Sequence, residues 1–127
     1  MQGPTLIIVR SSTGDTFGGC ASEAWACAGW IAAAGSFLFL IENPRGDAPT
    51  VFECKDSKRA IWGRPMWGPY FGGDLCISGT GPCSWTNFPS SYADTLGRGK
   101  QTFTATTGDQ WGCACFTVED YEVWAVS

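Results

Sequence analysis

Glycine and proline divide this chain into short apolar stretches, and this spacing limits what it can fold into. Seventeen glycines and seven prolines are spread over 127 residues, and the longest apolar run, Ile31 to Ile41, is itself interrupted by Gly35 and Ser36. Short apolar stretches between turn-forming residues are typical of strands joined by turns and not of long helices. The sequence therefore predicts a mainly β protein, built as an antiparallel two-sheet β-sandwich with short helices or structured loops.

The length and charge of the chain narrow its organisation and its partners. A chain of 127 residues can bury one core, so we expect a single domain over residues 1–127. With a net charge of −4 and only eight Lys and Arg residues, it offers no basic footprint for a phosphate backbone, and we expect no nucleic-acid partner. The longest apolar run is shorter than the roughly 20 residues that cross a bilayer, so no transmembrane segment is predicted.

Several segments carry local signals for strands. The β-branched run Leu6 to Val9, the turn residues 12–15 and the return at Thr16 predict a hairpin over residues 5–20. Residues 37–41 are apolar without a break, which predicts a strand buried on both faces. Further short strands are expected at 51–54, 75–78, 103–106 and 121–126, the last of them under cover.

One segment has the composition of a helix, and two Phe-Gly-Gly motifs have the composition of turns. Residues 21–34 alone have a helix-like composition, with Ser22 as a possible cap, and we expect a short helix or a structured loop there. Phe17-Gly18-Gly19 and Phe71-Gly72-Gly73 lack the spacing of phosphate-binding loops. We therefore interpret both Phe-Gly-Gly words as tight turns.

Aromatic residues are more numerous than a core of this size hides comfortably. The chain has seven Trp, eight Phe and three Tyr, and apolar patches seldom stay exposed on monomers. Trp and Tyr side chains dominate the energetics of protein interfaces. The excess therefore predicts a protein partner, although the same residues could instead belong to the core. Those that we expect to anchor the partner are Trp62, Trp67, Tyr70 and Trp85.

The titratable residues give little support for catalysis. The chain has no histidine, which excludes Ser-His-Asp and Cys-His nucleophilic sites. A carboxylate pair for glycoside hydrolysis is an alternative, but carboxylates at turns and strand ends are usually solvated or bonded to backbone N–H groups. We expect Glu122 to point outward or to pair with a cation such as Arg10. The carboxylate candidates are Asp74, Asp94, Glu119, Asp120 and Glu122.

The cysteines favour reduced thiols over a disulfide framework. Their number is odd, and nothing after Met1 resembles a secretory signal. They also lack the two closely spaced pairs of a zinc site, so we expect no metal and no cofactor. A redox role for Cys113 and Cys115 is left as an alternative, and it would require a lowered thiol pKa. The seven are Cys20, Cys27, Cys54, Cys76, Cys83, Cys113 and Cys115.

Five words in fixed order resemble a TLDc domain. They are Gly3-Pro4-Thr5-Leu6, Phe17-Gly18-Gly19, Phe37-Leu38-Phe39, the segment from Gly68 to Ile77, and Tyr121-Glu122-Val123-Trp124. The resemblance implies a β-sandwich core and an association with oxidative-stress resistance and with the rotary proton-pumping ATPase. The helical segment that usually precedes the first word is missing here, and we expect one edge of the sandwich to be left open to a neighbouring protein.

These observations predict a non-enzymatic protein-interaction module. We expect a small subunit or assembly factor of a larger, multisubunit protein complex. One alternative is a reversible regulator of the rotary proton-pumping ATPase, linked to oxidative-stress resistance. Another is an enzyme of unknown reaction, for which no catalytic residue can be named.

Overall fold

A computed structural model describes residues 4–23, 29–63, 70–78, 81–104 and 113–125. Over these ranges the chain is mainly β, as predicted, and its helical parts are two short 3₁₀ turns, η1 (Ser57–Arg59) and η2 (Gly99–Thr102). The strands are β1 (Thr5–Ser11), β2 (Thr16–Ala21), β3 (Gly29–Ile31), β4 (Phe37–Glu42), β5 (Thr50–Glu53), β6 (Ile61–Gly63), β7 (Tyr70–Phe71), β8 (Leu75–Cys76), β9 (Gly81–Thr86) and β10 (Ala114–Ala125).

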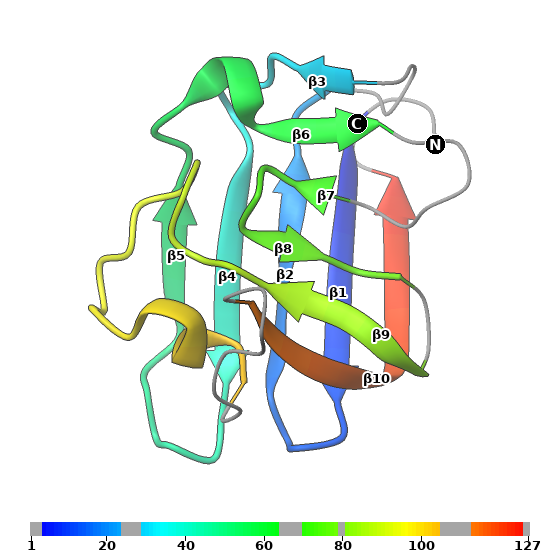
Figure 1. The fold of residues 1–127 in the computed structure, drawn as a ribbon, viewed down its shortest axis with the longest axis vertical. Helices are drawn as coiled ribbons and strands as arrows, with labels where there is room; N and C mark the ends of the chain where they lie inside the picture. Colours follow the sequence, from blue (N-terminus) through cyan, green and yellow to red (C-terminus); the bar gives the residue numbers. More distant parts are fainter. Residues whose placement is uncertain (1–3, 24–28, 64–69, 79–80, 105–112, 126–127) are drawn as a thin grey trace.

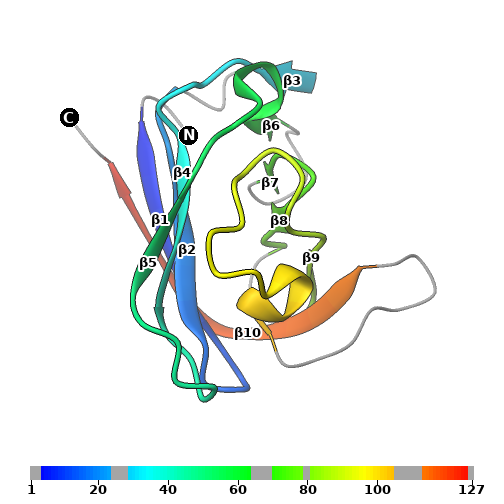
Figure 2. The same ribbon diagram turned by 90° about the vertical axis from the view of Figure 1, so that its left-hand side faces the viewer.

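The described strands form one continuous antiparallel sheet in the order β3-β6-β7-β8-β9-β10-β1-β2-β4-β5. Figures 1 and 2 show this sheet folded into two layers, with β1, β2, β4 and β5 in one and β6 to β9 in the other. We expected two separate sheets, and that separation is not confirmed. The reason is β10, which pairs with β9 through residues 114–118 and with β1 through residues 118–125.

The bend of β10 coincides with two irregularities in its pairing. Opposite β1, the partners of Arg10 and Ser11 are Asp120 and Val118, so Glu119 is an extra residue on β10. Opposite β9, Phe116 pairs with Ser84 and Val118 pairs with Gly81, so β9 has one residue more. Bulges of this kind bend a strand and increase its twist. They let one strand serve both layers.

The core lies between the two layers and is rich in phenylalanine. Phe17 of β2 lies 5.0 Å from Phe103 and 5.2 Å from Phe116 of β10, measured between ring centroids. Phe88 lies 5.0 Å from Phe52 and 5.2 Å from Phe103. All five rings are buried, and most of these contacts are edge-on, which aromatic pairs prefer. The cluster therefore joins both layers to the segments that connect them.

Several predicted strands are confirmed, whereas others are wrong in extent or environment. The hairpin over residues 5–20 and the strands near 37–41 and 51–54 are present. Only Leu75–Cys76 of the predicted strand 75–78 is a strand. A strand at 103–106 is wrong where the chain is described, because Phe103 follows η2 and its ring enters the core, and residues 105 and 106 lie outside the described ranges.

Burial on both faces is also wrong for two strands. On β4, Leu38 and Leu40 are buried, but Phe37 and Phe39 are only half-buried, because no layer formed by the described residues covers their face. Residues 121–125 of the predicted strand 121–126 are the end of β10, where Tyr121 and Val123 are exposed instead of covered, and residue 126 lies outside the described ranges.

The helix-like segment 21–34 contains no helix where it is described. Residues 29–31 form strand β3, and Ala32 to Ala34 lead from it without helical structure. Residues 24–28 lie outside the described ranges. The alternative of a structured loop therefore holds only for residues 22–23 and 32–34, because Ala21 ends β2 and residues 29–31 are a strand.

The first Phe-Gly-Gly word lies inside strand β2 and is not a turn. A Cβ atom on Gly18 would overlap the Ile7 carbonyl oxygen of β1, and one on Gly19 would lie 2.6 Å from the Phe71 ring of the opposite layer. These glycines therefore allow close approach of neighbouring elements. The second word is a turn as predicted, because Gly72 has a φ of +60°.

Gly19→Ala is expected to lower the free energy of unfolding by about 2 kcal/mol, because the added methyl group must displace the buried Phe71 ring. Urea unfolding of the variant and the parent chain measures the difference. Gly73→Ala is the matched control, because its Cβ would meet only the Ser90 hydroxyl at 3.7 Å. Equal stability of the two variants would contradict this account of the glycine.

Candidate protein-interaction surface

Four aromatic side chains form a continuous row across the second layer. In the strand register Trp30 of β3 lies opposite Trp62 of β6, and Trp62 lies opposite Tyr70 of β7. Cys76 of β8 then links Tyr70 to Trp85 of β9. The centroid distances are 4.8 Å for Trp30 to Trp62, 5.9 Å for Trp62 to Tyr70 and 5.8 Å for Tyr70 to Trp85. We call these four residues the aromatic ladder.

The aromatic ladder lies on the face of its layer that points away from the core. Successive side chains of a strand point to opposite faces, and the neighbours Ile61 and Phe71 are fully buried in the core. The exposed fraction of the side chain falls from 43% at Trp30 to 8% at Tyr70. It rises again at the far end of the ladder, where Trp85 is half-buried. A partner can therefore reach the ladder most readily at its Trp30 end.

The structure brings together three of the four predicted anchors, Trp62, Tyr70 and Trp85. Trp67 lies outside the described residues. Sequence reasoning missed Trp30, because the segment around it has a helix-like composition. The signal that would have found it is strand register, which places Trp30 opposite Trp62.

The ladder rings support one another in a fixed arrangement. Neighbouring rings are tilted by 41° to 46°, and each such aromatic contact contributes about 0.5–1.5 kcal/mol beyond the burial of its area. Side chains that are already held in place lose less freedom when a partner binds. The ladder is therefore a preorganised apolar surface.

Three of the described thiols lack the lowered pKa that a redox sensor requires. Cys20, Cys54 and Cys76 are free thiols. Burial raises the pKa of all three, whereas reactive cysteines have a lowered pKa. Cys115, one of the two predicted redox candidates, is exposed on β10 opposite Trp85, and Cys113 is half-buried.

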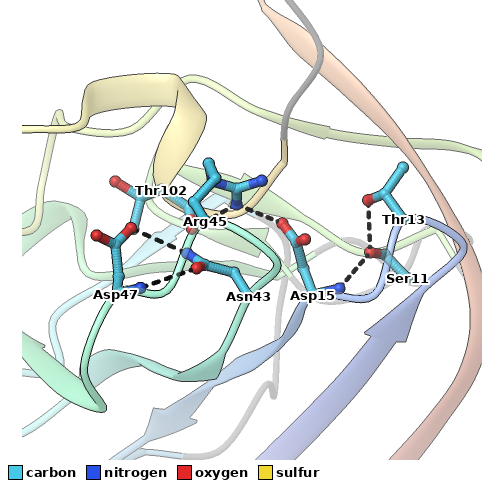
Figure 3. Close-up of polar contacts among 7 residues, drawn as sticks. All are labelled: Ser11, Thr13, Asp15, Asn43, Arg45, Asp47 and Thr102. Atoms are coloured by element: carbon cyan, nitrogen blue, oxygen red, sulfur yellow. Dashed lines mark hydrogen bonds and ion pairs between the residues drawn. The ribbon is translucent and has the colours of Figure 1, made fainter.

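A polar cluster joins three turns at the end of the molecule opposite β3 and β6 (Figures 1 and 3). Arg45, between β4 and β5, donates through Nη2 to Asp15 Oδ2 at 2.7 Å and to the Thr102 carbonyl at 3.4 Å. Asn43 and Asp47 brace the same loop, because Asn43 Nδ2 donates to Asp47 Oδ2 at 3.0 Å. The cluster therefore ties the β1–β2 turn and the β4–β5 turn to η2.

The ion pair in this cluster is desolvated and incompletely bonded. Burial raises the pKa of Asp15, and Arg45 opposes that rise by favouring the charged carboxylate. Among the described residues, Asp15 Oδ1, Arg45 Nε, Arg45 Nη1 and Thr102 Oγ1 have no hydrogen-bond partner. A buried pair of this kind contributes more to how the three turns fit together than to net stability.

Asp74 holds the layer that carries the ladder. It is fully buried, and its carboxylate accepts backbone N–H bonds from Ser90 at 2.8 Å, Ser91 at 2.7 Å and Tyr92 at 3.0 Å. Burial raises the pKa of Asp74, and the three N–H donors oppose that rise. The Tyr92 hydroxyl continues the network by donating to the Ala60 carbonyl at 2.6 Å, just before β6. The interpretation of Asp74 as a carboxylate bonded to the backbone is confirmed.

Two of the three carboxylates of β10, Asp120 and Glu122, also have a structural partner. Arg10 contacts Glu122 at 2.9 Å, as expected, and Asp120 at 3.3 Å. Asp94 accepts backbone N–H bonds from Gly97 and Gly99, both at 2.8 Å. Within the described ranges, no three His, Cys, Asp or Glu side chains are placed to hold a metal ion. Among the described residues, no helix has the length and apolarity to span a membrane.

Comparison with protein families shows which family the chain belongs to. The family model of the TLDc domain matches residues 1–127, the whole chain. This chain belongs to the TLDc domain family. The family is associated with protein interaction and with oxidative stress. A comparison with curated proteins finds no significant match.

The TLDc words of the sequence occupy defined places in the structure. The first word leads into β1, the Phe-Gly-Gly word forms the close contact of β2 with the opposite layer, and the last word lies in β10. The word around Asp74 supplies β7, the following turn and β8. The TLDc word around Asp74 thus supplies β7, which carries Tyr70 of the ladder, and β8, which lies between Tyr70 and Trp85 in the register.

Asp74→Asn is expected to lower the free energy of unfolding by about 3 kcal/mol, because an amide NH₂ group would replace an oxygen that accepts buried N–H bonds. Thermal and urea unfolding measure the loss. Asp94→Asn is the matched control, because Asp94 also accepts two backbone N–H bonds but is not buried. A loss at Asp94 equal to that at Asp74 would contradict the role given to burial.

Proposed function

We propose that this chain is a single TLDc domain, residues 1–127, that acts as a non-enzymatic protein-interaction module. Its role is that of a small subunit or assembly factor of a larger protein complex. The observation that carries the proposal is the aromatic ladder, a row of three Trp and one Tyr on the outer face of the second layer. Trp62, Tyr70 and Trp85 are its anchors, together with Trp30, and Trp67 stays a prediction.

The composition of the ladder strands supports this proposal. Strands β3, β6, β7, β8 and β9 contain no charged residue, and the cores of protein interfaces are depleted of charge and enriched in Trp and Tyr. Complete burial of a large apolar side chain contributes about 1.5–3 kcal/mol. A partner that covers the exposed Trp30 end therefore gains binding energy and meets no unpaired charge on these strands.

The state of the titratable groups supports a non-enzymatic role. The chain has no histidine, and the carboxylates of Asp74, Asp120 and Glu122 are engaged with backbone N–H groups or with Arg10. General acid–base catalysis needs a group that can reach the proton it transfers. An enzyme of unknown reaction remains the competing hypothesis.

A reversible regulator of the rotary proton-pumping ATPase is the alternative interaction role. It derives support only from the association of the TLDc family with oxidative stress and with that pump. The two roles differ in stoichiometry, because a structural subunit stays bound in a constant ratio, whereas a regulator binds part of the time. Purification in mild conditions therefore separates them.

The test is affinity purification of the tagged chain from its native source, with the co-purifying proteins quantified by mass spectrometry. Trp30→Ala combined with Trp85→Ala is expected to reduce the captured partner about tenfold, which corresponds to the loss of about 1.4 kcal/mol. Ile41→Ala is the control, because Ile41 is 41% exposed but lies on β4 in the other layer. Its captured partner is expected to be unchanged.

Two results of this purification distinguish a structural subunit from a regulator, and a third contradicts the proposal that the ladder is the interface. A partner in constant ratio that resists salt supports a subunit, and pump subunits in low ratio support the regulator. Thermal unfolding of the variants checks that each is folded, and Trp30→Ala alone serves if the double variant is not. Full capture by the folded ladder variants would contradict the ladder as the interface.

A further inference from the structure

A second exposed apolar surface lies at the C-terminal end of β10. Residues 119–125 pair with β1 on one side, whereas the pairing of β10 with β9 ends at Val118. Among the described residues, this segment therefore has a strand neighbour on one side only, and Figure 1 shows its other side facing outward. We call residues 119–125 the β10 edge.

The β10 edge carries apolar side chains that continue the core face. Tyr121 lies opposite Val9, and Val123 lies opposite Ile7, both of which are fully buried. Yet Tyr121 is 39% and Val123 is 45% exposed, because this end of β10 leans away from the opposite layer (Figure 2). Trp124, on the outer face, is 54% exposed. The core face thus extends to an edge where nothing described covers it.

The charge of the β10 edge determines what can pair with it. Glu119, Asp120 and Glu122 provide three carboxylates, and the ion pairs with Arg10 provide one guanidinium for two of them. Two copies paired through this edge would bring like charges within cross-strand distance, which is destabilising. A partner strand with positive charge would instead be attracted to these carboxylates. The edge therefore selects against a second copy of this chain.

We propose that the β10 edge accepts an extended basic segment of a partner protein as an added strand. Alternate apolar side chains of that segment cover Tyr121 and Val123, and the Lys or Arg residues between them face Asp120 and Glu122. Backbone hydrogen bonds along the edge supply affinity, and the alternating side chains supply specificity. The inference rests on the proposed function in taking the occupant to be a protein, but it uses a surface separate from the aromatic ladder.

The test is fluorescence anisotropy of the whole chain with a labelled peptide of about eight residues that alternates Val and Lys. We expect saturable binding, weakened by added salt and about tenfold tighter than that of a peptide alternating Val and Glu. A Val–Lys peptide with N-methyl groups at alternate amides is expected to lose binding, because it cannot donate backbone hydrogen bonds. This comparison needs no protein variant.

A pair of matched variants locates the binding. Val123→Lys is expected to weaken binding of the Val–Lys peptide about tenfold, because it places a like charge and a polar group on the edge. Val51→Lys, at a 54% exposed position on β5, which is separated from β10 by β1, β2 and β4 in the sheet, is expected to leave it unchanged. Thermal unfolding of both variants verifies that they are folded.

Three results would overturn the proposal. They are equal affinity for the Lys and Glu peptides, equal weakening by the two variants, and a dimer in sedimentation experiments that Val123→Lys dissociates, since a second copy would then be the occupant. These results are distinguishable from a failure of the proposed function, because the peptide assay does not involve the ladder residues Trp30 and Trp85.

Discussion

The pairing of β10 with both β9 and β1 is the constraint on which the rest of this structure depends. Residues 114–118 extend the layer of β9, and residues 118–125 extend the layer of β1. Buried backbone N–H and C=O groups need hydrogen-bond partners. If β10 separated from β9 or from β1, backbone groups of both strands would lose their partners. The bend between Phe116 and Asp120 therefore determines how the two layers face each other.

Both proposed surfaces follow from this arrangement. Gly19 and Phe71 let the two layers approach closely across the core. The outward side chains of β6, β7 and β9 form the ladder, and no other described strand lies over them. Asp74 holds the segment behind these strands. The same long strand that closes the core also extends past it, which leaves the β10 edge accessible.

The sequence predicts what depends on neighbours along the chain better than what depends on neighbours in space. The first hairpin is confirmed because β-branched residues and turn residues act locally, and the pair of Glu122 with Arg10 is confirmed because opposite charges on outward positions attract. The predicted strand at Phe103 is wrong because core burial of the ring outweighs local β-propensity. Trp30 is missing from the predicted anchors because strand register decides which side chains meet.

Hydrogen–deuterium exchange of the chain alone and in its purified complex tests the central claim, that the ladder face is the interface. Strand β3 is an end of the sheet, so the amides of residues 29–31 exchange readily in the free chain. We expect the complex to slow exchange in residues 29–31 and 61–63. Unchanged exchange there, with new protection confined to β5 or to the β1–β2 turn, would contradict it.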